Sequence, residues 1–138
     1  MRSLLLSLVV LVAVFNPAMA GPREDILATY ATQAKRADPA FAGFSAKRGE
    51  AFYLAERTGG EWSGVSSCTT CHTKDPTKVG RQPDTGKEVD AMAASVSSDR
   101  FMKPERTEKW FTRNCKGVLG RECTALEKGD FVTYILSK

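Results

Sequence analysis

The pentapeptide Cys68-Thr-Thr-Cys71-His72 constrains this chain more than any other feature. It has the Cys-x-x-Cys-His pattern of c-type haem attachment, and His72 is the only histidine in the sequence. Two thiols spaced in this way can reach the two vinyl groups on one edge of a porphyrin, and the adjacent imidazole can then bind the iron. We therefore expect one haem c, covalently bound through Cys68 and Cys71, with His72 as the proximal metal ligand.

Two other uses of the cysteines compete with haem attachment. A thioredoxin-like redox pair would need a βαβ pattern around the motif, and segments typical of strands are nearly absent. A four-cysteine zinc site would add Cys115 and Cys123, but the seven residues between them exceed the usual ligand spacing. The pattern therefore favours haem.

The first twenty residues are typical of a secretory signal peptide. Arg2 supplies a positive charge, the stretch 4–15 is apolar apart from Ser7, and Ala18-Met19-Ala20 is a cleavage site of the A-x-A type. The apolar stretch is too short to span about 30 Å of hydrocarbon, so we do not expect a membrane anchor. We expect cleavage after Ala20, a single cytochrome domain over residues 21–138, and localisation in the periplasm.

Composition narrows the class of protein further. The chain has 138 residues, which suit one domain, and its charged fraction of 26% excludes a protein with several membrane spans. The 20 basic and 16 acidic residues are well mixed, which argues against a nucleic-acid partner or a polybasic membrane patch. Much of the Leu and Val lies in the leader, and only 9% of the chain is aromatic. We therefore expect a bound porphyrin to fill a core that is otherwise short of apolar side chains.

The remaining segments predict an all-α domain. A polar stretch over residues 73–100 has little periodicity, and so long a loop is reasonable in a small domain only if it wraps a large ligand. Gly129 in the last helix predicts a close approach to another helix, for which Gly49 is the natural counterpart. The expected helices are Glu24–Arg36, Ala46–Glu56 capped by Ser45, Pro104–Arg113, and a last helix that opens at the capping box Thr124-Ala-Leu-Glu127.

The sixth iron ligand stays open at this level, because no second histidine exists. Met92 and Met102 are the thioethers left after signal cleavage, and Met102 precedes a proline-led helix. A methionine ligand would give a low-spin electron carrier of raised potential. Asn114 is the other candidate, although an asparagine at the end of a helix is more often a C-cap. Trp110 lies one turn before Asn114 and can pack on the haem or in the core.

Several spaced motifs resemble the sphaeroides haem protein (SHP) family of small high-spin class I c-type cytochromes. The similarity covers about residues 46–138, and its combination of motifs is specific. The matching stretches are Thr58-Gly59-Gly60, Ser67-Cys-Thr-Thr-Cys-His72, Thr85-Gly-Lys-Glu88, Asp99-Arg100-Phe101, Lys109-Trp110-Phe-Thr-Arg113-Asn114-Cys115, Val118-Leu-Gly120-Arg121-Glu-Cys123-Thr124 and Glu127-Lys128.

The resemblance implies a class I cytochrome c fold with an extra N-terminal helix and a haem-wrapping loop. It implies that Asn114 is the sixth ligand, bonded through its side-chain oxygen, and that Cys115 and Cys123 form a disulfide. It also implies binding of O₂ and NO by the reduced protein, and electron transfer from a dihaem cytochrome c.

The leading hypothesis is therefore a periplasmic monohaem cytochrome with a distal site gated by its redox state. Asn114 would bind the oxidised iron and leave on reduction, so that O₂, NO or CO can bind. Its redox partner would be a dihaem cytochrome c or a membrane cytochrome. The alternative is a His/Met carrier that uses Met102. A peroxidase-type distal His or Arg pair is not evident, which favours a carrier and gas-binding protein over an enzyme.

Overall fold

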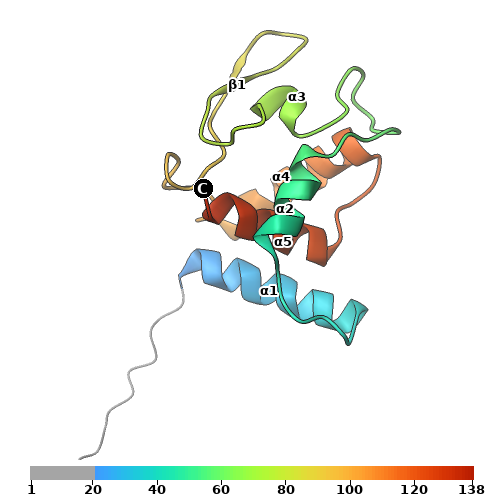
Figure 1. Ribbon diagram of the computed structural model, residues 1–138, viewed down its shortest axis with the longest axis vertical. Helices are drawn as coiled ribbons and strands as arrows, with labels where there is room; N and C mark the ends of the chain where they lie inside the picture. Colours follow the sequence, from blue (N-terminus) through green and yellow to red (C-terminus); the bar gives the residue numbers. More distant parts are fainter. Residues whose placement is uncertain (1–20) are drawn as a thin grey trace, which may run out of the picture.

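The structure is a computed structural model that describes residues 21–138. The expected signal peptide lies outside the described residues. The order of elements is α1 (Pro22–Ala37), α2 (Ala46–Leu54), α3 (Thr69–His72), β1 (Gly80–Arg81), β2 (Glu88–Val89), α4 (Pro104–Leu119) and α5 (Ala125–Leu136) (Figure 1). The two strands form one short antiparallel hairpin, and everything else is helix or loop, so the predicted all-α fold class is confirmed.

Local signals in the sequence explain where most helices begin. Pro22 and Pro104 occupy first turns, where their missing N–H group costs nothing. The Ser45 hydroxyl accepts a hydrogen bond from the Arg48 amide at the start of α2. The predicted capping box at Thr124 and Glu127 is present at the start of α5, with both of its reciprocal hydrogen bonds.

The end of α4 differs most from the prediction. The helix was expected to end at Arg113, but it continues to Leu119 and stops at Gly120, which has a φ of 69°. A tertiary contact stabilises the extra turns, since the amides of Glu61 and Trp62 donate to the carbonyls of Lys116 and Gly117 at 3.2 and 3.0 Å. The bond from Trp62 satisfies a terminal carbonyl of the helix, at Gly117, whereas the Lys116 carbonyl also accepts from the Gly120 amide at 2.9 Å. Asn114 therefore lies inside a helix, and the C-cap interpretation of this residue is wrong.

Helix α5 is the central element, with α1 and α2 both packed against it (Figure 1). Gly49 of α2 allows the close approach, because a Cβ atom there would lie 2.6 Å from the backbone of Asp130 and 2.8 Å from Cβ of Tyr134. The predicted pairing of Gly49 with Gly129 is not found. Gly129 instead leaves room for the ring of Phe44, so each glycine accommodates a different neighbour.

The core is an aromatic cluster centred on Phe131 of α5. The Phe131 ring contacts those of Phe52, Tyr53, Phe101 and Phe111 at centroid distances between 5.6 and 6.4 Å, in edge-on or tilted arrangements. Such pairs add to the free energy gained by burying the rings. Aromatic residues of α2, of the loop before α4 and of α4 itself thereby contact one residue of α5.

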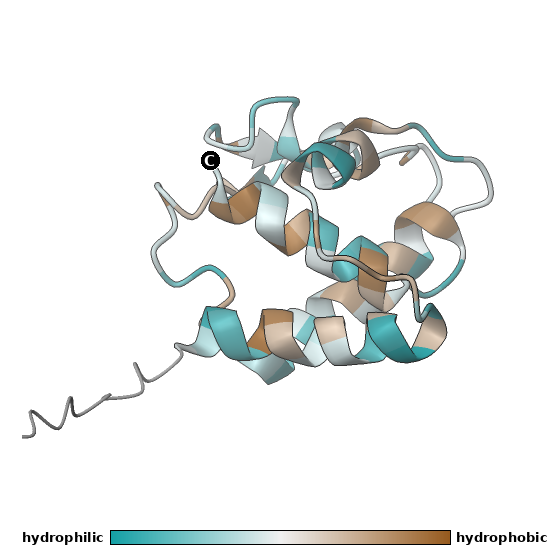
Figure 2. Cartoon of the chain, turned by 60° about the horizontal axis from the view of Figure 1, so that its bottom comes forward, coloured by the Kyte–Doolittle hydropathy of each residue, from teal (hydrophilic) through white to brown (hydrophobic). Residues whose placement is uncertain are grey.

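Helix α1 packs on this core through a single stripe. Its buried residues are Ile26, Tyr30 and Ala34, which share one face of the helix, and Figure 2 shows hydrophilic and hydrophobic residues mixed along it. The Tyr30 hydroxyl donates to Glu108 of α4, whose carboxylate also pairs with Lys128 of α5 at 2.7 Å. This network joins three helices.

Within residues 21–138, the structure has no helix with the length and apolar character needed to cross a membrane.

We predict that Gly49→Ala destabilises the protein, although Ala is the better helix former. The new methyl group would force α2 away from α5, and overpacking of this kind costs about 1–3 kcal/mol. The measurement is the thermal unfolding midpoint of the haem-loaded protein, with Lys47→Ala at an exposed position of the same helix as the control. An unchanged midpoint for Gly49→Ala would contradict the close helix contact.

Candidate haem-binding site

A cavity of about 440 Å³ lies between α3, the β1–β2 hairpin and α4. This volume lies within the usual range for sites that bury a small organic ligand or cofactor. Five residues singled out by the sequence line the same cavity: Cys68, Cys71, His72, Trp110 and Asn114. Aromatic side chains from the core, including Phe111 and Phe131, form much of the remaining wall.

The two cysteines of the motif are free thiols at the start and in the body of α3. Burial raises the pKa of Cys68 to about 11, despite the opposing charge of Arg57, and burial also raises the pKa of Cys71. Both thiols are therefore neutral at physiological pH and are not activated nucleophiles of the redox type. This state does not suit the competing thioredoxin-like interpretation.

The imidazole of His72 is in the neutral state that can bind a metal ion. Burial, followed by the charge of Arg100, lowers its pKa to about 4, with the backbone of Asp90 acting in the opposite direction. The ring is therefore neutral above about pH 4, which is the state that ligates iron. Nδ1 is buried without a full hydrogen bond to any of residues 21–138, whereas Nε2 stays accessible.

Tyr53 of α2 fixes the position of α3. It is completely buried, and its hydroxyl donates to the carbonyls of His72 and Thr73 at 3.2 and 2.7 Å. The hairpin supports α3 from another direction, since a Cβ at Gly80 would lie 2.9 Å from the carbonyl carbon of Cys71. No local signal in the sequence points to the role of Tyr53 at the motif.

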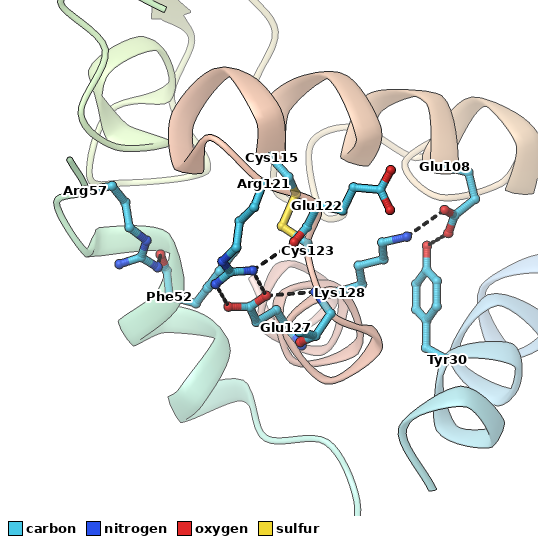
Figure 3. The surroundings of a disulfide bond; sticks show 11 residues. Tyr30, Phe52, Arg57, Glu108, Cys115, Arg121, Glu122, Cys123, Glu127 and Lys128 are labelled. Carbon is cyan, nitrogen blue, oxygen red and sulfur yellow. Dashed lines mark hydrogen bonds and ion pairs between the residues drawn. A yellow bond between two sulfur atoms is a disulfide. The ribbon is translucent and has the colours of Figure 1, made fainter. Parts of the chain in front are cut away.

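Asn114 enters the cavity wall from α4. The residue is partly buried, and its side chain makes no hydrogen bond with residues 21–138. The next residue, Cys115, forms a disulfide with Cys123 across a Cα–Cα distance of 5.6 Å, which joins α4 to the segment before α5 (Figure 3). The disulfide therefore links the helix that carries Asn114 to the segment before α5.

Trp110 occupies the rim of the cavity and is 45% exposed. The guanidinium of Arg113 stacks 5.6 Å from the ring of Trp110 and 5.6 Å from that of Trp62. Trp62 was missed by sequence reasoning, yet it also lines the cavity and packs on Gly117, where a Cβ would lie 2.6 Å from the indole. The lack of a side chain at Gly117 is the only local hint of this contact.

Met102 does not lie in the cavity wall. It is 40% exposed, whereas the adjacent Phe101 and Lys103 line the cavity. The exposure of Met102 and its absence from the cavity wall argue against the alternative His/Met ligation. The thioether that does line the cavity is Met92.

The residues fit covalently bound haem. Two neutral thiols and an accessible imidazole nitrogen share one wall of an aromatic cavity, and a polar amide stands in the wall formed by α4. When bound, haem supplies a one-electron redox couple and an iron coordination position. Cys115 and Cys123 are joined in a disulfide, so they are not available for a four-cysteine zinc site.

We predict that Cys68→Ser/Cys71→Ser abolishes cooperative folding. Without attached haem, the aromatic cavity wall would face water, and the helices would lose their common contact. The measurement is near-UV circular dichroism during heating. The matched control, Cys115→Ser/Cys123→Ser, should keep its haem and unfold cooperatively with a loss of about 2–3 kcal/mol. A cooperative transition in the first variant would contradict the prediction.

We also predict that Tyr53→Phe lowers stability by about 1–3 kcal/mol, because two buried carbonyls next to His72 lose their donor. Thermal unfolding of the haem-loaded protein tests this. Tyr134→Phe is the matched control, since the Tyr134 hydroxyl makes no hydrogen bond with residues 21–138. Equal midpoints for the two variants would argue against a role for Tyr53 in holding α3.

Comparison with known proteins identifies the family of this chain. A family described as a domain of unknown function (DUF1924) matches residues 39–135. Cytochrome c-type protein SHP of Cereibacter sphaeroides is 40% identical over 123 residues, or 89% of this chain and 91% of that protein. The structure of oxidised SHP, an oxygen-binding cytochrome c, superposes with a TM-score of 0.76 at 39% identity, covering 84% of this chain and 96% of that one.

A second relative is cytochrome c'' of Methylophilus methylotrophus. Its solution structure, which bears on haem-ligand detachment, matches with a TM-score of 0.73 at 32% identity, covering 84% of this chain and 93% of that one. The sequence similarity, the shared helical fold and the site geometry agree, and the chain belongs to the SHP family of c-type cytochromes.

Proposed function

We propose that this protein is a periplasmic cytochrome with one haem c, in which Asn114 is a redox-dependent sixth ligand. Cys68 and Cys71 would attach the haem, and His72 would bind the iron permanently. Asn114 would bind the oxidised iron and withdraw after reduction, which leaves a position for O₂, NO or CO. The single attachment motif in the sequence supports one haem.

The observation that carries this proposal is the environment of Asn114. Its side chain lines the cavity that contains His72, and it makes no hydrogen bond with residues 21–138 that ligation would have to break. Neither polar atom of the Asn114 amide is buried without a partner, so its donors and its acceptor are accessible. The amide is therefore available to a ligand in the cavity.

The chemistry of the amide supports a redox-dependent bond. A neutral carboxamide oxygen is a hard ligand, which suits Fe(III) better than the softer Fe(II). Addition of an electron therefore weakens the hold of Asn114, while the imidazole nitrogen of His72 remains suitable for both states. Asn114 lies on α4, and the disulfide at Cys115 limits how far this part of the backbone can move.

The relatives support gas binding and ligand release. SHP is an oxygen-binding cytochrome c, and cytochrome c'' is a protein in which haem-ligand detachment has a structural basis. Arg113, between two indole rings at the rim, adds a positive charge beside Asn114. A donor at this position favours polar diatomic ligands, because distal polarity decides how such ligands are held.

The role in the cell would be electron transfer coupled to ligand binding. A dihaem cytochrome c or a membrane cytochrome would supply the electron, in the compartment that the signal sequence indicates. The exposed Trp110 lies at the cavity rim, where a partner could approach closely.

Asn114→Ala tests the ligand assignment. In the wild-type ferric protein, azide must displace Asn114, whereas in the variant it finds an open position, so we expect ferric azide binding at least tenfold faster. CO binding to the ferrous protein should change less than twofold, since Asn114 has already withdrawn. Stopped-flow absorbance measures both rates.

The matched control is Met92→Leu, which removes the thioether of the cavity wall and should leave both rates unchanged. Equal ferric azide rates in Asn114→Ala and wild type would refute the ligation by Asn114. A loss of the native ferric spectrum in Met92→Leu would instead indicate a methionine ligand.

A further inference from the structure

Arg100 is a cavity residue whose guanidinium lacks most of its partners. Its one side-chain hydrogen bond runs from Nη2 to the carbonyl of Ala91 at 2.7 Å. Its Nε is covered by the protein and has no acceptor among residues 21–138. Nη1 likewise has no acceptor there, but it is accessible. A guanidinium offers five N–H donors, so most donors of Arg100 lack an acceptor at the cavity wall.

The charge of Arg100 is also uncompensated. No carboxylate of residues 21–138 lies within 4 Å of it, and the neighbouring Asp99 pairs with Arg106 at 3.8 Å instead. Burial lowers the pKa of Arg100; the charges of Asp99 and Asp90 oppose this effect, and that of Arg106 adds to it. A partly desolvated cation without a paired anion is costly. The missing partner is therefore an anion that the cavity ligand brings.

We propose that Arg100 is the binding residue for a carboxylate of the cavity ligand, namely one of the two propionates of haem. The proposal rests on haem as the occupant, which the proposed function also requires, but it does not depend on Asn114 as a ligand. The bond would use the terminal guanidinium nitrogens, whose planar fork matches a carboxylate.

Hydrogen bonds from neighbouring residues fix the position of Arg100. Arg23 of α1 donates to the backbone carbonyls of Arg100 and Ser98 at 2.9 and 2.8 Å. The acceptor of the Arg100 side chain, the Ala91 carbonyl, is also held by the Ser97 hydroxyl at 2.7 Å. Arg23 is thus a positioning residue, and the N-terminal helix acquires a role at a site that it does not touch.

Other cations near the hairpin and the cavity are less suitable. Arg81 donates to the Gly86 carbonyl at 2.6 Å, lies near Glu88, and is absent from the cavity wall. Arg106 lines the cavity, but it is largely exposed and paired with Asp99. Lys87 also lines the cavity, but it is exposed and free to extend into solvent.

Arg100→Gln tests the proposal through the midpoint potential of the haem, measured by spectroelectrochemistry. Loss of the guanidinium leaves a propionate charge unbalanced, which favours the ferric state. We expect the equilibrium constant for reduction to fall about tenfold, or about 59 mV for one electron. Arg106→Gln removes the same charge from the same rim and should shift the potential by less than half as much.

The pH dependence separates a propionate contact from a general loss of charge. In the wild type, Arg100 keeps the propionate ionised, so the potential should be nearly constant between about pH 5 and 8. In Arg100→Gln, the propionate pKa rises into this range, and the potential should fall with increasing pH. Arg100→Lys should restore part of the potential, and Arg23→Gln should shift it in the direction of Arg100→Gln but less.

Equal potentials and flat pH profiles for Arg100→Gln and wild type would overturn the proposal, as would a larger shift in Arg106→Gln or Lys87→Gln. If Arg100→Gln does not yield a haem-loaded protein, two other variants decide. The proposal would be overturned if Arg100→Lys has the potential and pH dependence of the wild type and Arg23→Gln has an unchanged potential. Haem content is measured separately by the pyridine haemochrome spectrum. A wild-type protein without haem c would refute the cofactor assignment itself, whereas the azide result at Asn114 leaves the Arg100 measurement unaffected.

Discussion

The fold depends on the shared use of one set of aromatic side chains as both core and cavity wall. Phe101, Phe111 and Phe131 belong to the buried cluster and also line the cavity, as does Cys115. A domain of this size buries a modest share of its surface, so loss of contacts on one side of its core is serious. If haem occupies this cavity, filling the cavity and completing the core are the same event, and folding would be coupled to cofactor attachment.

The loop before the attachment motif and the last turns of α4, which are distant in sequence, contact each other directly. The loop before the attachment motif donates from Glu61 and Trp62 to the last turns of α4, and Gly60 lies where a Cβ would be 2.6 Å from the Val118 carbonyl oxygen. The segment that leads into Cys68 thus rests on the helix that carries Asn114. The two walls of the cavity are therefore joined by direct backbone contacts.

Sequence patterns predicted the parts that are governed by local rules. The capping box at Thr124 and the proline at the start of α4 each have a short-range physical cause, and the helix starts that they mark were predicted correctly. The last turns of α4 were not predicted, because they are stabilised by amides of residues 61–62, more than fifty positions away in the sequence. Tyr53 and Trp62 were missed for the same reason, since their roles exist only after distant segments pack together.

Electrostatics connects these features to the proposed function. The charge of Arg100 lowers the pKa of His72, and Arg113 is the residue next to Asn114 in the sequence. A guanidinium therefore lies near each of the two candidate iron ligands. Neither forms an ion pair within residues 21–138. Positive charge next to a buried redox centre favours the state with one more electron, and in the proposed function that is the state from which Asn114 withdraws. A propionate bound to Arg100 would offset one of these charges and leave Arg113 as the excess. The charge balance of the cavity would therefore set the potential at which the distal position opens, while the chemistry of the amide would determine only that it opens on reduction.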